Sequence, residues 1–170
     1  MDVVSHGLWG SLAFGRKNRK SFWTAFCFGV APDLFSFGVF FLSTLLGFSE
    51  RPHFGSEPPD PALIPAYVGS LYNFTHSLLV FAAAFLLLGV IVRRPVWEAS
   101  AWGLHILFDI PTHSYRFFPT PFLWPLSGFR VNGQSWASPW IFFPNIIILA
   151  LLYLWFFILR PRSPRANTSS

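Results

Sequence analysis

Four long apolar segments dominate the chain. They cover residues 21–48, 63–92, 97–112 and 137–159, and polar or basic stretches separate them. A bilayer core of ~30 Å holds no water to satisfy backbone N–H and C=O groups, so only helices and closed barrels cross it. Apolar runs of this length are typical of membrane helices. We therefore expect an all-α fold, a polytopic membrane helical bundle with four long transmembrane segments.

The composition excludes an ordinary water-soluble domain. The chain is 53% hydrophobic and 20% aromatic, and only 11% of its residues are charged, whereas soluble domains carry about 25%. The single cysteine, Cys27, excludes a disulfide framework and a multi-cysteine zinc site. The net charge of +5 is typical of Lys and Arg at the ends of membrane helices, so we expect membrane lipids and no nucleic acid as partners.

The remaining stretches complete a single domain. Residues 2–15 are typical of a short helix with Gly and Ser on one close-packing face, too short to cross a bilayer. Residues 115–136, rich in Pro, Gly and aromatic side chains, are predicted to form an ordered interfacial loop. We expect one membrane-embedded helical domain over residues 1–160 and a disordered polar tail over 161–170.

The basic residues predict an orientation. Nine of the twelve Lys and Arg residues lie in the 16–20 loop, at 93–94 and at 160–165, and the other three are Arg51, Arg116 and Arg130. Four spanning segments place all nine on one side, which the positive-inside rule identifies as cytoplasmic. The 49–62 and 115–136 loops then face outward. We expect an integral, multi-pass protein of a bacterial inner (plasma) membrane.

Ionisable side chains interrupt these apolar segments. The stretch Trp102–Ser114, WGLHILFDIPTHS, carries His105, Asp109 and His113 at i, i+4 and i+8, so the three share one helix face. A carboxylate in hydrocarbon is costly unless a partner or a cation compensates it. This helix face therefore predicts a polar site inside the bundle.

Three more ionisable residues join the same prediction. Asp33 follows Pro32 in the first long segment, His76 lies in the second, and His6 lies in the short helix. Counted at ~1.5 Å per helical residue, these groups cluster at mid-depth to the outer half of the bilayer. Similar depth predicts a shared metal site with Asp33, His76, His105 and Asp109 as its centre; the full set of candidate ligands is His6, Asp33, His76, His105, Asp109 and His113.

Imidazole and carboxylate ligands favour a divalent metal, with zinc first and manganese as the alternative. Such a metal would acidify a bound water for hydrolysis. Simpler interpretations stay open at single positions: His105 and Asp109 as a buried pair locking two helices, His6 as a packed side chain, and His53 as a solvated loop residue. Two other functions also stay open: a small transporter or ion/proton conduit, and a non-catalytic membrane scaffold.

The ordered motifs resemble those of a known family. The chain has His6, Pro32-Asp33, Thr75-His76-Ser77, His105 with Asp109, and Trp124-Pro125, in this order. This set resembles the membrane-bound metal-dependent hydrolases, which include the LexA-binding, inner-membrane-associated hydrolases. The resemblance implies a metal-dependent hydrolase and names no substrate.

The resemblance includes one departure. Many members carry His-Arg-Gly before the Thr-His-Ser, where this chain has Leu71, Tyr72 and Asn73. A second metal, or an arginine that clamps a phosphate, is therefore in question, and His113 is a candidate for the missing imidazole. From its membrane depth we expect the site to act on a lipid-like ester or phosphoester.

Overall fold

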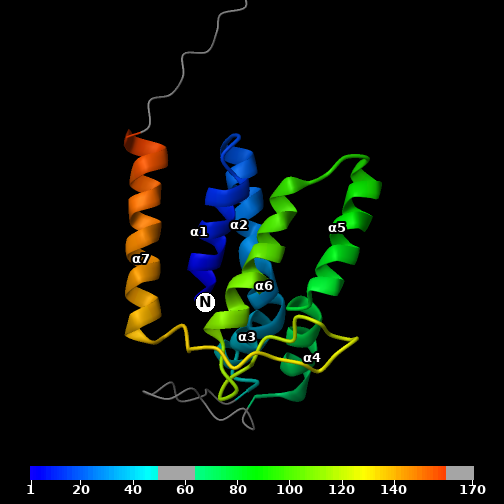
Figure 1. Ribbon diagram of the computed structural model, residues 1–170. Coiled ribbons are helices and arrows are strands. Elements are labelled where there is room, and N and C mark those ends of the chain that lie inside the picture. Colours follow the sequence, from blue (N-terminus) through cyan, green and yellow to red (C-terminus); the bar gives the residue numbers. More distant parts are fainter. Residues whose placement is uncertain (50–63, 160–170) are drawn as a thin grey trace, which may run out of the picture.

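The computed structural model describes residues 1–49 and 64–159, and over these residues the fold is helical without a strand. The α-helices pack as a bundle (Figure 1). They are α1 (Val3–Phe14), α2 (Arg19–Asp33), α3 (Val39–Leu45), α4 (Ala66–Thr75), α5 (Leu78–Val92), α6 (Ser100–Thr112) and α7 (Pro139–Tyr153), with π-helical turns at Leu34–Gly38 and Leu154–Leu159 and a 3₁₀ turn at Trp97–Ala99. The predicted all-α class is confirmed.

Two continuous helices, Arg19–Leu45 and Pro139–Leu159, are long and apolar enough to cross a membrane. A third candidate is the pair α4 and α5, if these helices, bent by 60° at their junction, form one broken span. The remaining expected segment, residues 97–112, contains α6, whose 13 residues rise only about 20 Å. Four long spanning segments are therefore not confirmed, because α6 ends at Thr112, just after Pro111.

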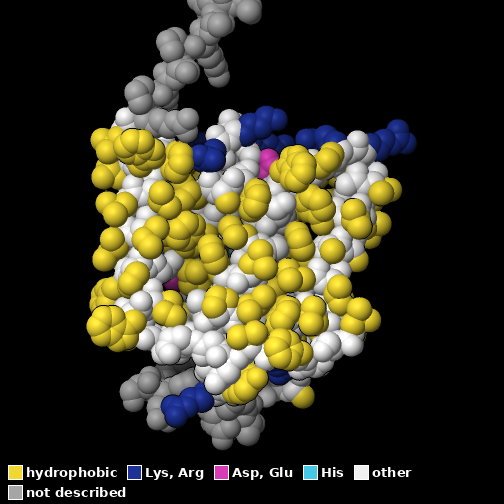
Figure 2. All heavy atoms as spheres, viewed as in Figure 1, with side chains coloured by type: hydrophobic (Ala, Val, Ile, Leu, Met, Phe, Trp, Pro, Cys, Tyr) yellow, Lys and Arg dark blue, Asp and Glu magenta, His cyan; other side chains and the backbone are white. Residues whose placement is uncertain are grey.

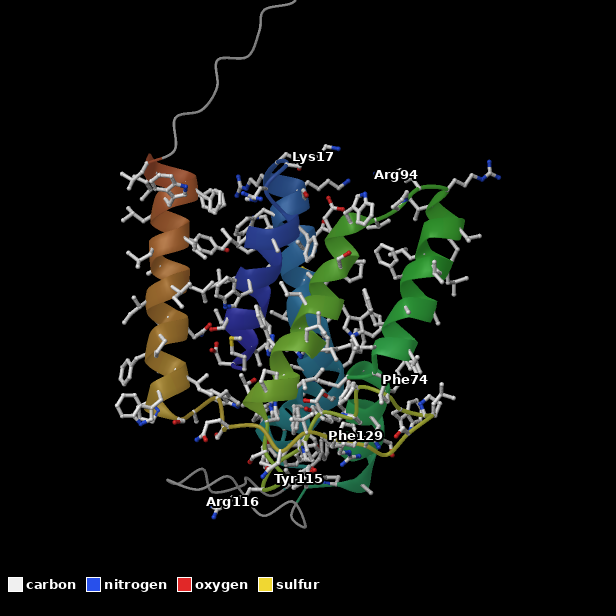
Figure 3. All side chains as sticks on the ribbon, in the orientation of Figure 1. Lys17, Phe74, Arg94, Tyr115, Arg116 and Phe129 are labelled. Atoms are coloured by element: carbon white, nitrogen blue, oxygen red, sulfur yellow. The ribbon has the colours of Figure 1, made fainter. Side chains whose placement is uncertain are left out.

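The surface is divided into an apolar belt and a basic end. Hydrophobic side chains cover the flank of the bundle in Figure 2, and Lys and Arg side chains gather along its upper edge. Figure 3 places Lys17 and Arg94 at this end, and Tyr115, Arg116 and Phe129 at the opposite end. This distribution agrees with the predicted orientation; Arg51, the tail and most of the 49–62 loop lie outside the described residues.

Small side chains bring the central helices close together. Gly7, Gly10 and Ser11 are buried on α1, which packs on α2, α6 and α7. A Cβ atom at Gly10 would lie 2.7 Å from the Cβ of Ala101 on α6, and one at Gly29 would lie 2.6 Å from the carbonyl oxygen of His6. Close backbone approach therefore requires glycine at these positions. The expected close-packing face of the short helix is present.

The junction of α4 and α5 is held by the interfacial loop. Thr75 ends α4, and the Ser77 side chain caps α5 by accepting hydrogen bonds from the N–H groups of residues 79 and 80. The Ser77 hydroxyl also donates to the carbonyl of Trp124, and Leu78 N–H donates to Phe122 O at 3.0 Å. This loop, residues 115–136, contains no helix and crosses the lower end of the bundle in Figure 1.

Candidate metal centre

Four ionisable side chains from three separate segments meet inside the bundle. Asp33 ends α2, His76 lies at the α4–α5 junction, and His105 and Asp109 lie one turn apart on α6. One ligand atom from each lies within 4.8 Å of all the others. His76, His105 and Asp109 are at most 1% exposed, and the Asp33 side chain is 12% exposed. The structure thus brings together the four residues predicted as the centre, and this group could hold a metal ion.

The histidine protons point away from the centre. His105 Nδ1 lies 2.7 Å from the carbonyl oxygen of Gly29, and His76 Nδ1 lies 3.2 Å from that of Tyr72. A carbonyl oxygen only accepts, so each Nδ1 carries the proton of its ring. In the neutral rings both Nε2 atoms then present lone pairs toward the centre. This orientation by a backbone carbonyl is the one that metal-binding histidines generally have.

With both rings neutral, the inward-facing atoms lack a proton donor among themselves. His76 Nε2 and His105 Nε2 lie 3.0 Å apart. Asp109 Oδ2 lies 3.1 Å from His105 Nε2. Asp109 Oδ2 is buried without a hydrogen-bond partner. Lone pairs and carboxylates at this distance repel one another unless a cation lies among them. A proton on one ring would satisfy the contact between the two rings, whereas a divalent cation would satisfy all four residues.

The spacing of the four atoms fits a metal. A tetrahedral ion with bonds of about 2.0–2.1 Å has ligands about 3.3–3.4 Å from each other. His76 Nε2 lies 3.5 Å from Asp33 Oδ1 and 3.5 Å from Asp109 Oδ2, and His105 Nε2 lies 3.8 Å from Asp33 Oδ1. These distances and the two shorter ones bracket the tetrahedral value. The donor set and these five distances are therefore compatible with a divalent metal ion.

The other carboxylate oxygen of Asp109 faces different groups. His6 Nε2 lies 2.9 Å from Asp109 Oδ1, His113 Nδ1 lies 3.3 Å from it, and the α-amino group of Met1 also contacts it. The His6 ring stacks on that of His105, with centroids 3.6 Å apart. His6 and His113 therefore contact Asp109 and do not belong to the four-residue group. A direct ligand role for either remains a prediction.

Sequence reasoning missed two residues that orient the histidines. Gly29 supplies the carbonyl for His105, and Tyr72 supplies the carbonyl for His76 and stacks on its ring with centroids 3.8 Å apart. Gly29 lies four residues before Asp33 on the same helix face, a spacing that could have identified it. Tyr72 likewise lies four residues before His76, so the same spacing could have identified it. His53, predicted to be solvated, lies outside the described residues.

No protein-family model, curated protein or solved structure matches this chain.

Proposed function

We propose that the chain is a membrane-embedded, metal-dependent hydrolase that acts on a lipid-like ester or phosphoester. The observation that carries this proposal is the convergence of two imidazole and two carboxylate ligands at distances that fit one divalent ion. Structural zinc sites are mostly built with cysteine, whereas catalytic sites use histidine and carboxylate and keep a position for water. By donor type, a site of two His and two Asp resembles the second kind. Three of the four as ligands would leave a position for water, whereas all four would fill a tetrahedral ion.

The metal, when bound, would supply a water acidified to a nucleophile and a positive charge for the oxygen that develops negative charge. The chain's own residues bind and orient it. His76 and His105 hold their Nε2 atoms inward through their carbonyl contacts. Asp33 is more exposed than Asp109, so water and substrate would arrive from the side of Asp33. Zinc is our first choice, and manganese is the alternative.

A membrane position supports the lipid-like substrate. The two long apolar helices and the exposed hydrophobic belt suit an integral protein. We propose a multi-pass protein of a bacterial inner membrane with the basic end in the cytoplasm, following the positive-inside rule. We also propose membership of the membrane-bound metal-dependent hydrolases. This membership rests on the ordered motifs. Two of the motifs are in contact, because Ser77 of Thr75-His76-Ser77 donates a hydrogen bond to the carbonyl of Trp124 in Trp124-Pro125.

Metal analysis of the purified protein tests the proposal. We expect about one zinc or manganese per chain, lost in Asp33→Ala and in Asp109→Ala and kept in Glu98→Gln. Glu98 is the matched control because it precedes α6 at the basic end and accepts a hydrogen bond from Ser21, 2.6 Å away. The metal-loaded protein should hydrolyse a panel of lipid-like esters or phosphoesters, and chelation should abolish this activity.

Two results would end the proposal. A well-folded preparation that binds no divalent metal would remove its basis. A protein that binds metal and hydrolyses nothing in the panel would leave a metal site without hydrolase chemistry. Metal-dependent ion flux in liposomes, abolished by Asp109→Asn, would then favour the alternative of an ion conduit.

A further inference from the structure

An apolar cavity adjoins the candidate metal centre. It has a volume of about 220 Å³, and Asp33 and His113 form part of its wall. The His113 side chain is 11% exposed and that of Asp33 is 12% exposed. Two other hollows on the molecule, around Arg16 and around Cys27, contain none of the site residues. The cavity therefore offers a route by which a ligand can reach the four-residue group.

Aromatic side chains make up most of the remaining wall. The aromatic residues come from α3, the turn before it and the interfacial loop, and Ile64 adds an aliphatic side chain: Phe37, Phe40, Phe41, Phe117, Trp136 and Ile64. Phe40 and Ile64 are almost fully buried and belong to an apolar cluster that also contains Val68. One part of the wall is fixed to the end of α6, because Trp136 N–H donates to Thr112 O at 2.9 Å. This is a formed apolar site.

The size and charge of the cavity limit what it can hold. Drug-sized ligands occupy about 300–1,000 Å³, so 220 Å³ accommodates only part of a substrate. At about 30 Å³ per water-sized group, it holds roughly seven such groups. Among the described residues, Asp2 and Asp33 line it and no Lys or Arg does; Met1 also lines it, and its α-amino group already contacts the Asp109 carboxylate. A phosphate monoester, with about two negative charges, would meet two acidic residues here, no guanidinium, and an α-amino group that is already paired with a carboxylate.

We infer that this cavity binds the uncharged acyl group of a carboxylic ester, about six to seven carbons of it, and so selects carboxylic esters over phosphate monoesters. The inference rests on the proposed hydrolase function. In the reaction the oxygen of water bonds to the carbonyl carbon and the bond from that carbon to the alcohol oxygen breaks. One proton of water ends on the alcohol and the other is released as the carboxylate forms.

Photolabelling of the full chain in detergent micelles tests binding without relying on turnover. The probe is a hexanoyl amide with a diazirine on its acyl chain, in which the amide replaces the ester and resists hydrolysis. The comparison probe is a phosphate monoester with the same chain and diazirine. We expect the amide to label cavity residues between 37 and 41 and at 117 and 136. Labelling by the phosphate should be at least tenfold weaker.

Variants separate this inference from the metal proposal. Ile64→Trp fills the cavity and should lower labelling at least tenfold, while Leu87→Trp, on the exposed face of α5, should leave it unchanged. Trp136→Ala enlarges the cavity and should shift labelling toward a longer, decanoyl probe, which keeps the test open if Ile64→Trp does not fold. Asp109→Asn should lose metal yet keep labelling at the cavity.

The outcomes are distinct. Labels spread over the lipid-facing surfaces of α5 and α7, or equal labelling by the phosphate probe, would overturn the inference even if the protein binds metal. Specific cavity labelling in a protein that binds no metal would support an acyl-binding cavity and refute the hydrolase.

Discussion

Replacing Gly29 by alanine tests whether backbone packing orients the candidate metal centre. Gly29 lies where α1 crosses α2, and its carbonyl oxygen accepts from His105 Nδ1 at 2.7 Å. A Cβ atom there would lie 2.6 Å from His6 O and 3.0 Å from the Cα of Gly7, whereas ordinary contact begins at 3.4 Å. One helix must therefore move by about 0.8 Å to accept a single methyl group, since backbone atoms cannot rotate away.

The structure sets the size of the effect. Overpacking of this kind costs about 1–3 kcal/mol of unfolding free energy. The same movement displaces the carbonyl that holds His105, and loss of such a supporting contact typically weakens metal binding about 10–100-fold. The Gly29→Ala variant keeps all four candidate ligands, and we expect it to fold. It should unfold at a lower temperature than the wild type and bind zinc about 10–100-fold more weakly.

Gly69→Ala is the matched control. Gly69 is also a helical glycine, on α4, and nothing lies within 4 Å of a Cβ built there. Alanine should stabilise that helix by about 0.5–1 kcal/mol and leave zinc affinity unchanged. Competition with a chromophoric chelator measures affinity, and thermal unfolding in detergent measures stability. If Gly29→Ala binds zinc as tightly as the wild type does, close packing of α1 on α2 does not orient the site.

Three further predictions concern other parts of the bundle. Zinc at 100 times its Kd should stabilise the wild type by about 2.7 kcal/mol in thermal unfolding, and Asp109→Asn should show no such gain; equal gains would place the metal elsewhere. Asn145 accepts from an indole N–H and donates to a serine hydroxyl, both at 2.8 Å, so Asn145→Leu should cost about 1–3 kcal/mol, whereas the exposed Ile147→Val should cost little. The hydrogen bond from Ser21 lowers the pKa of Glu98 below its ordinary 4.5, so its stabilisation is present above that pH and lost as the pH falls through the lowered value; the stability difference between wild type and Ser21→Ala should therefore vanish in acid.

The sequence was sufficient to identify the four central residues because charge in an apolar segment is rare and costly. Apart from Glu98 at the start of the 97–112 segment, Asp33 and Asp109 are the only acids within the long apolar segments, and the i, i+4 spacing placed His105 beside Asp109. Similar depth along separate helices then indicated one shared pocket. These inferences need only helix geometry and the energetics of hydrocarbon.

Most supporting contacts could not be predicted because they join distant parts of the chain; the contact of His76 with the Tyr72 carbonyl, four residues away, is the exception. The 63–92 segment reads as one continuous helix, yet it bends by 60° after Thr75. The bend is held by the carbonyls of Phe122 and Trp124, more than forty residues away. The contact of His105 with the Gly29 carbonyl spans 76 residues. Local periodicity carries no information about which backbone carbonyl on another helix a ring nitrogen will meet.

The helix irregularities and the polar cluster explain each other. Asp33 lies where α2 passes into a π-helical turn, His76 lies at the α4–α5 break, and Asp109 lies in the last turn of α6, two residues before Pro111. Interrupted helices are tolerated at membrane depth only where protein or a cavity surrounds them, and π-helical turns often occur at functional sites. A bundle that needed only stability would gain by replacing these breaks with regular apolar helix. Each of the three irregularities places an ionisable side chain near the same point. This arrangement is expected of a site selected for binding. Restoring helix regularity with Pro111→Ala should therefore change metal affinity more than it changes stability.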